Sequence, residues 1–281
     1  MGKLKGFIRD WTPPALLRAA VGRRSPQNRF SGEYSDWGAA QRASSGYASE
    51  IIFEKTRSAA LAVKEGRAVF ERDSVLFDHV EYPFPMLAGL LRAACENGGD
   101  LSVLDFGGSL GTSFRAFDSF RYGAGKLRWS IVDQPRIVEC GQREFTNQSL
   151  NFYASIRECL ERERPQVLLL SSVLQYLERP HEVIQQAKAE NFAHIIIDRT
   201  PCSYSARDIL TVQTVPPSIY EASYPCWIFS RQRLVDALSD QYALLTHVQG
   251  ERLGRRGDSS QQSWDAFLFD LKDPKGLRHP P

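Results

Sequence analysis

A glycine-rich turn after a short apolar strand is the first feature of the sequence that could do chemistry. The segment LSVLDFGGSLGTSFRAF begins at Leu101, and Gly107, Gly108 and Gly111 separate its strand from a helix that starts near Thr112. Glycines let a backbone turn sharply and come close to a ligand. The helix start presents free N–H groups and the positive end of its dipole to that ligand. The turn therefore predicts a site for a phosphate, a nucleotide or another anionic group.

The next apolar strand ends in a carboxylate that fits the same site. In LRWSIVDQP, Asp133 and Gln134 follow the strand and precede Pro135. A carboxylate here can accept charge-assisted hydrogen bonds from both hydroxyls of a ribose. Alternatively, Asp133 caps the helix that Pro135 starts, and the two roles are compatible. A turn, a helix, a strand and an acid in this order indicate a cofactor that carries a ribose.

A third segment, QVLLLSSVLQYLERP, ends another buried strand with small polar residues. Because ligands of open parallel sheets bind at the carboxyl ends of the strands, we expect Ser171 and Ser172 at the edge of the cofactor. Gln175 and Tyr176 follow them and are expected to line the site. The alternative is an ordinary connection from a strand to a helix, with Tyr176 half-buried.

The strand that ends in IIIDRTP supplies the candidates for the acceptor side. Asp198 could act as a base, and Arg199 could bind an acidic acceptor through two hydrogen bonds. The alternative is a structural ion pair between them. Residues 199–229, rich in proline and aromatics, are expected to form a long substrate-side loop, since such loops in compact domains tend to be functional. Glu221 and Tyr224 are its substrate-binding candidates.

An alternation of strands and helices positions these residues. It predicts a parallel sheet with helices on both faces. The last two strands are joined by a polar loop without a helix, so we expect them to pair antiparallel. The expected strands are residues 102–106, 127–133, 150–154, 166–171, 194–198, 242–248 and 265–271, and the expected helices are residues 112–122, 136–146, 180–190 and 230–239.

The chain divides into parts of different texture. Residues 1–97 form a basic arm and a mostly helical cap, residues 98–272 form the α/β domain, and residues 273–281 form a flexible tail. The arm carries several Lys and Arg against Asp10 alone, together with apolar residues, so it could lie on an anionic membrane surface. The alternative is a loosely packed arm with solvated charges. No apolar run approaches the length of a membrane span.

Composition excludes several other functions. The formal net charge of +2 gives no support to nucleic-acid binding. The five cysteines follow no C-x-x-C pattern, which argues against a disulfide framework and against a zinc site, and indicates a reducing cytoplasm. No paired acidic cluster suggests a magnesium site, so no metal is expected. The sequence has no serine-hydrolase elbow and no P-loop.

The glycine turn resembles the D/E-x-G-x-G-x-G turn of S-adenosylmethionine-dependent methyltransferases, with Ser109 where the middle glycine is expected. If this position needs a positive φ, a serine costs roughly 1–2 kcal/mol; alternatively, Gly108 adopts the turn conformation instead. Over residues 98–272 the chain is similar to class I methyltransferases. It resembles more narrowly a bacterial family associated with polysaccharide and envelope biosynthesis, through VLDFGGSLG, SSVLQYL, IIIDRTP, SYPCWIFS and GEYSDWGAA.

This resemblance implies a doubly wound, seven-stranded Rossmann-like α/β sheet whose last strand is antiparallel, with a helical N-terminal extension. It also implies S-adenosyl-L-methionine as the cofactor and in-line methyl transfer to a small-molecule or glycan-precursor acceptor in the cytoplasm. Aromatic rings near the sulfonium would add cation–π attraction, and the candidates are Tyr34, Trp37, Tyr176, Tyr224 and Trp227. The expected cofactor-binding residues are Asp105, Phe106, Gly107, Gly108, Gly111, Asp133, Gln134, Ser171 and Ser172, and the expected catalytic residues are Asp198, Tyr176 and Arg199.

Two other functions stay open at this stage. An oxidoreductase with an NAD(P) cofactor would carry a helix between the last two strands, and the sequence indicates none. A non-catalytic protein at the inner face of a membrane would use the basic arm as its anchor, and Ser109 would then mark a vestigial cofactor site. The sequence leaves open the acceptor, the methylated atom, the need for a base and the oligomeric state.

Overall fold

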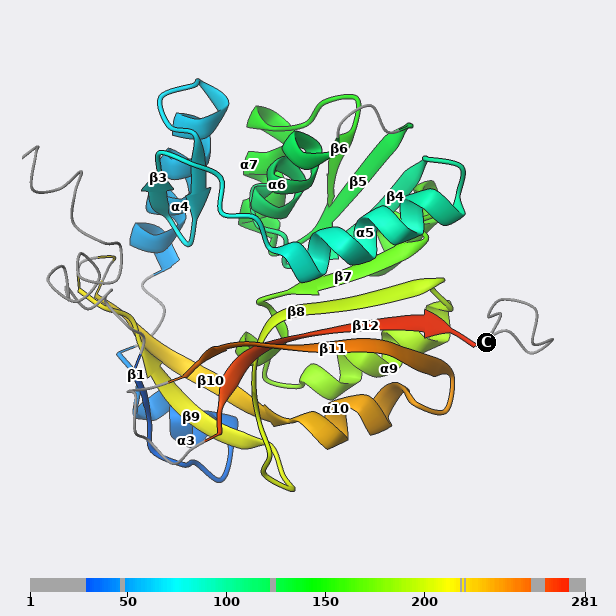
Figure 1. The fold of residues 1–281 in the computed structure, drawn as a ribbon. Helices are drawn as coiled ribbons and strands as arrows, with labels where there is room; N and C mark the ends of the chain where they lie inside the picture. The colour runs from blue at the N-terminus through cyan, green and yellow to red at the C-terminus, as the bar shows by residue number, and fades with distance from the viewer. Residues whose placement is uncertain are drawn as a thin grey trace, which may run out of the picture.

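A sheet of ten strands runs through the molecule (Figure 1), and seven of these strands form its central part. The computed structural model describes residues 29–45, 49–121, 125–217, 219, 221–253 and 261–272. The seven strands are β4 (Leu101–Phe106), β5 (Leu127–Val132), β6 (Leu150–Tyr153), β7 (Val167–Ser171), β8 (His194–Ser203), β11 (Tyr242–Arg252) and β12 (Ser263–Leu271).

The order of the strands is that of a doubly wound sheet. Strands β6, β5, β4, β7 and β8 are neighbours in this order and run parallel. β12 pairs antiparallel with β8, and β11 pairs antiparallel with β12 at the end of the sheet. The strand order reverses beside β4, which is the point where ligands bind in such sheets. The prediction of a doubly wound sheet with an antiparallel last strand is therefore confirmed, and β1, β9 and β10 extend the sheet beyond the seven strands expected.

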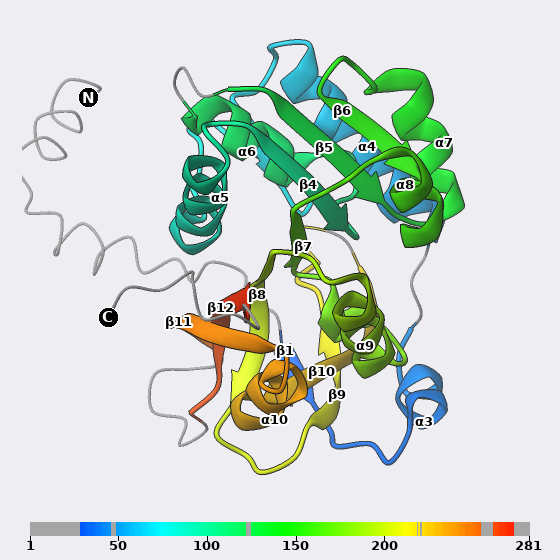
Figure 2. The ribbon, with the colours of Figure 1, turned by 90° about the vertical axis from the view of Figure 1, so that its right-hand side faces the viewer.

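Helices cover both faces of this sheet (Figure 2). Neighbouring residues of β4 show this, since Val103 and Leu104 are both fully buried but belong to two different core clusters. A strand buried on both faces explains the unbroken apolar runs in the sequence. One cluster includes residues of α5 (Phe84–Glu96), α6 (Thr112–Phe120) and α7 (Pro135–Glu144), and the other those of α8 (Ile156–Arg162), α9 (Pro180–Glu190) and α10 (Arg231–Leu238).

The prediction of a loop over residues 199–229 is wrong, because most of this segment forms strands. β8 continues to Ser203, and β9 (Ile209–Thr214) and β10 (Ser223–Ser230) form an antiparallel pair. Pro225 lies within β10 and makes the segment look irregular in the sequence. It is tolerated because the described register joins β10 to β8 only at Phe229 and Ser230, so one edge of β10 needs no N–H at the proline.

The N-terminal extension packs against the sheet and against this strand pair. β1 (Arg29–Ser31) adds to β9, and α3 (Trp37–Arg42) contacts β9 and β10. α4 (Ser49–Lys64) contributes Ala60 to the same core cluster as α5 and α6. A hairpin of β2 (Phe70–Arg72) and β3 (Val75–Phe77) lies between α4 and α5 in the chain.

Some expectations fall outside the part of the chain that the structure describes. They are the basic arm, whose residues 1–28 are not described, and the tail at residues 273–281. Among the described helices, none is long and apolar enough to span a membrane.

Candidate functional site

The glycine turn adopts left-handed backbone conformations between β4 and α6. Gly107 has φ +74°, Ser109 has φ +51° and Gly111 has φ +95°. The strain therefore falls on Ser109 itself, and Gly108 does not relieve it. A Cβ atom on Gly107 would lie 2.3 Å from Cγ2 of Val173, so this turn also packs closely against the segment that follows β7.

Asp133 lies directly beside this turn. Its Oδ2 accepts a hydrogen bond of 2.9 Å from the backbone amide of Ser109, and its Oδ1 accepts one of 2.7 Å from the amide of Gln134. Burial raises the pKa of Asp133, and these two amides oppose the shift. Each carboxylate oxygen has a second lone pair, so the group can still accept two further hydrogen bonds. The structure thus brings the turn and the expected ribose-binding acid together.

Asp105 forms the buried floor of the turn. Its Oδ2 accepts a hydrogen bond of 3.0 Å from Nε1 of Trp129, whereas its Oδ1 is buried and has no hydrogen-bond partner among the described residues. Burial raises the pKa of Asp105 to about 7, against the effect of the Trp129 hydrogen bond. A buried acceptor without a donor costs free energy, so this oxygen is prepared for a ligand that donates a hydrogen bond.

The end of β7 and the middle of β8 place a second group of polar residues next to the turn. Ser171 pairs with Asp198 across these strands, and its Oγ donates a hydrogen bond of 3.1 Å to Oδ2 of Asp198. The buried position raises the pKa of Asp198, although the charge of Arg199 and the Ser171 hydrogen bond oppose this. The amide of Ser172, which has φ +56°, donates to the carbonyl of Asp198.

Arg199 has an unusual backbone. Its φ is +47°, and the register of β12 against β8 is irregular here, because Asp265 pairs with Thr200 and Phe267 pairs with Ile197. Two residues of β8 thus oppose one of β12, which is a β-bulge, a feature common beside active sites. The positive charge of Arg199 lowers the pKa of both Asp105 and Asp198, so it acts on both groups of acids.

Two aromatic rings meet between the segment after β7 and β10. Tyr176 in the short helix η1 (Leu174–Tyr176) contacts Tyr224 of β10 edge to face, with 5.3 Å between the ring centroids. Its Oη donates a hydrogen bond of 3.1 Å to Oε1 of the buried Gln213. Ile52 of α4 packs into the same cluster, so the extension and the strand pair meet above the site.

The hairpin of the extension supplies residues that the sequence analysis missed. Glu71 is buried and accepts hydrogen bonds from Thr112 and from Nη2 of Arg115 (2.6 Å), both at the start of α6. The charges of Arg72 and Asp73 reach the site electrostatically, since Arg72 lowers the pKa of Asp198 and Asp73 contributes to raising that of Tyr176. Asp73 and Ser74 both have positive φ, as a two-residue primed turn requires. In the sequence, the signal for this hairpin is the pair Asp73 and Ser74 between the segments FER and VLF.

Other expected residues lie elsewhere. Glu221 is exposed beyond β9, and among the described residues it makes no hydrogen bond or ion pair. Tyr34, Trp37 and Trp227 pack against a cluster that includes α3, which is distinct from the cluster of Tyr176 and Tyr224. Phe106 is half-buried against the core, and Gln134 is the N-cap residue of α7, where its amide binds Asp133 while its side chain is exposed. No cluster of ligating side chains among the described residues could hold a metal ion.

Comparisons with known proteins give a distant likeness. No protein-family model matches the chain, and no curated protein matches it. A solved structure of 1,6-didemethyltoxoflavin-N1-methyltransferase from Burkholderia thailandensis is 15% identical over 81% of this chain and 92% of that chain, with a TM-score of 0.42. An S-adenosylmethionine-dependent methyltransferase from Clostridium acetobutylicum is 11% identical over 77% of this chain and 98% of that chain, with a TM-score of 0.45. At these identities and TM-scores, no residue role is transferred from those proteins to this chain.

Proposed function

We propose that this protein is an S-adenosyl-L-methionine-dependent methyltransferase that acts on a small-molecule or glycan-precursor acceptor. One observation carries the proposal: the amide of Ser109 in the glycine turn and the carboxylate of Asp133 meet at 2.9 Å. The turn and the acid at the end of the next strand thus form one continuous surface at the switch point of the sheet. An amide-rich turn beside an acid suits a ligand with an amino-acid end and a ribose.

The charges at this surface fit that cofactor. S-adenosylmethionine carries a sulfonium, an ammonium and a carboxylate. Asp105 offers the unpartnered Oδ1 to a donor such as the ammonium, and Asp133 offers free lone pairs to the ribose hydroxyls. The positive charge of Arg199 acts on Asp105, and its guanidinium suits the carboxylate. The amides after Phe106 would bind the amino-acid end.

The residues of this chain would orient the acceptor and exclude water. The bound cofactor supplies an already activated methyl group, so positioning is the main task of the protein. Tyr176 and Tyr224 close the acceptor side, and burial raises the pKa of Tyr176 well above its usual range, which keeps its hydroxyl a hydrogen-bond donor. Asp198, with its raised pKa and its Ser171 hydrogen bond, would accept a proton from a hydroxyl or ammonium acceptor.

The other two functions receive less support. β11 and β12 pair directly as antiparallel neighbours, which is not the parallel crossover of an NAD(P) oxidoreductase. Ser109 adopts the left-handed conformation, and its amide binds Asp133. Serine in place of the expected glycine therefore keeps the shape of the turn, which supports a working cofactor site over a vestigial one. We place the protein in the cytoplasm because all five cysteines are free. Peripheral membrane contact through the basic arm stays a prediction.

Titration calorimetry tests the cofactor. We expect S-adenosylmethionine and S-adenosylhomocysteine to bind with a Kd on the order of micromolar, and Asp133→Ala to weaken both at least about tenfold. Asp118→Ala, which removes an exposed acid of α6, is the control and should change nothing. Binding of NAD in place of these ligands, or equal affinities in both variants, would refute the proposal.

A further inference from the structure

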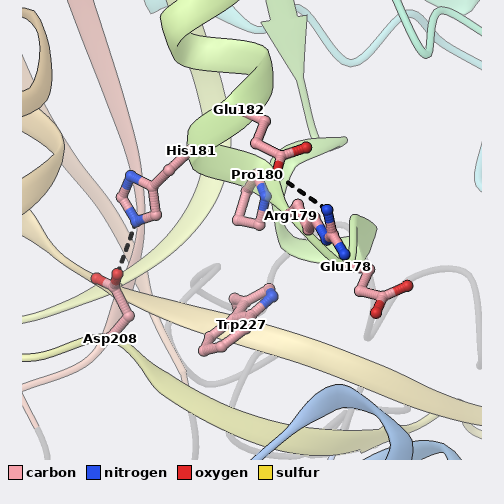
Figure 3. A pocket seen from close by; sticks show the side chains of 7 residues that line it. All are labelled: Glu178, Arg179, Pro180, His181, Glu182, Asp208 and Trp227. Carbon is pink, nitrogen blue, oxygen red and sulfur yellow. Dashed lines mark hydrogen bonds and ion pairs between the residues drawn. The ribbon is translucent and has the colours of Figure 1, made fainter.

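A cavity of about 260 Å³ lies apart from the glycine turn, since no residue of that turn lines it. Its lining residues come from the start of α9, from the turn after β8 and from β10 (Figure 3): Glu178, Arg179, Pro180, His181, Glu182, Asp208 and Trp227. The volume is slightly below the ~300–1,000 Å³ of sites for drug-sized ligands, and suits a ligand built around one ring.

The middle of this cavity is apolar and flat. The indole of Trp227 lies on one side and the ring of Pro180 on the other (Figure 3). Nε1 of Trp227 donates a hydrogen bond of 3.0 Å to the carbonyl of Leu177, which fixes the orientation of the indole. Such a pair of walls favours a ring that presents C–H groups or a π face to the indole.

The two ends of the cavity are polar and paired. At one end, Nε2 of His181 lies 2.8 Å from Oδ2 of Asp208, and Arg233 adds an ion pair of 3.3 Å to the same acid. Burial alone would raise the pKa of Asp208, but the hydrogen bonds from His181 and the amide of Ser230 outweigh it, so the pKa is lowered and the acid is ionised. Both a donor and an acceptor are thus fixed at this end.

The opposite end carries a second ion pair, which is exposed to solvent. Nη1 of Arg179 and Oε1 of Glu182 form an ion pair of 3.2 Å, and Glu178 lies beside Arg179 (Figure 3). Because most carboxylates here already have a cationic partner, the cavity favours neither a full anion nor a full cation. Ion pairs instead offer neighbouring donors and acceptors, which vicinal hydroxyl groups need.

We propose that this cavity binds one pyranose ring of a carbohydrate. Its C–H faces would pack between Trp227 and Pro180, and its hydroxyls at opposite ends would meet the His181–Asp208 and Arg179–Glu182 pairs. A planar heteroaromatic ring has no hydroxyl groups that could bind the ion pairs at the two ends of the cavity. A quaternary ammonium group can form hydrogen bonds with neither pair.

The position of the cavity links it to the proposed methyl-transfer site. Tyr176 lines that site, and the next residue, Leu177, carries the carbonyl that binds Trp227. A carbohydrate in the cavity would therefore extend toward the acceptor side and define the acceptor as a glycan. This link rests on the proposed function, whereas the binding of a pyranose does not.

Amide correlation NMR on the full chain tests the site. The probes are methyl α-D-glucopyranoside and methyl β-D-galactopyranoside, with adenine and tetramethylammonium as comparators. We expect at least one glycoside to bind with a Kd on the order of millimolar and to shift residues 177–182 and the Trp227 indole. Arg179→Ala and His181→Ala should each weaken binding about tenfold through the loss of a hydrogen bond.

A matched variant controls for surface effects. Arg157→Ala breaks the exposed Arg157–Glu161 pair of α8, which has the same 3.2 Å separation, and should leave glycoside binding unchanged. Shifts at these residues from adenine or tetramethylammonium alone, no glycoside shifts, or equal affinities in all variants would overturn the proposal. S-adenosylhomocysteine calorimetry on the same samples separates the two proposals, since its failure would remove only the link to an acceptor.

Discussion

Burial sets the chemistry of three acids, two at the ends of β4 and β5 and one within β8. Asp105, Asp133 and Asp198 all have raised pKa values, and in each case burial is the largest cause. Each acid also accepts a hydrogen bond, from a Trp129 indole, a Ser109 amide or a Ser171 hydroxyl. Hydrogen bonds therefore hold these acids in place, but their oxygens can still accept further hydrogen bonds. This suits the binding of a cationic ligand with several hydrogen-bond donors.

Asp105 makes the stability of the protein depend on pH. Its pKa is about 7 in the folded state against an ordinary value of 3.8, so between about pH 4 and 7 the native state holds a proton that the unfolded chain has lost. Its contribution to the free energy of unfolding therefore falls as the pH rises through this window. We expect Asp105→Asn, measured by urea denaturation at about pH 5 and about pH 8, to lose less stability than the original protein. An equal loss in both proteins would contradict a perturbed Asp105.

Gly107 has a positive φ and also a close neighbour, whereas Gly66 has only the positive φ. Substitutions at the two positions therefore separate the cost of backbone strain from the cost of a clash. Gly107 and Gly66 have nearly the same φ, +74° and +73°, but a Cβ on Gly66 meets nothing within 4 Å, whereas one on Gly107 meets Val173 at 2.3 Å. We expect Gly66→Ala to cost about 1 kcal/mol of unfolding free energy, from backbone strain alone. Gly107→Ala should cost about 1–3 kcal/mol more, from the clash. Equal costs in denaturation would show that Val173 moves freely.

Residues of the candidate site could be predicted where the local sequence alone indicated them. The glycines and the acids after the strands are visible in the sequence because turns need particular residues. The Trp129–Asp105 hydrogen bond depends on the register between two strands, and the Ser109–Asp133 contact depends on the fold of the turn. Neither could be read from residue spacing, and the positive φ of Ser109 settled an alternative that the sequence left open.

At the scale of elements, the β2–β3 hairpin holds the extension to the helix that follows the glycine turn. Glu71 is 3% exposed and pairs with Arg115 of α6. Glu71→Gln leaves the arginine without its charge partner in a buried position, and we expect a loss of about 3 kcal/mol in unfolding free energy, measured by urea denaturation.

The same helix offers a control for this ion pair. Asp118→Asn removes the partner of Arg121 at the surface and should cost less than about 1 kcal/mol. A loss of similar size in the two variants would mean that the hairpin is not anchored by Glu71.

The elements that the sequence missed are those that depend on distant partners. The strands of the central sheet begin as local apolar runs and were expected within two residues of their observed bounds, except that β8 and β11 continue five and four residues further than expected. β9 and β10 are stabilised by pairing with each other, and β1 joins them across most of the chain. Pro225 and the prolines before residue 218 made this segment look like a loop. The helix α8 was also missed, since it is only seven residues long.

At the scale of the molecule, three separate parts enclose one edge of the sheet. The glycine turn and the strand ends form the floor, the β9–β10 pair carries Tyr224, and α4 carries Ile52 into contact with it. Lys55 of α4 also donates a hydrogen bond of 2.5 Å to the carbonyl of Ile219. The sequence predicted a cap and a substrate-side segment, but their meeting above the site is a tertiary contact that needed the structure.

A crystal structure of the protein with S-adenosylhomocysteine tests the central claim most directly. The account predicts the ribose hydroxyls within hydrogen-bond distance of Asp133, the amino-acid end on the amides after Phe106, and a donor on Oδ1 of Asp105. A ligand bound away from this turn, or a turn filled by its own side chains with no density for the nucleoside, would contradict it.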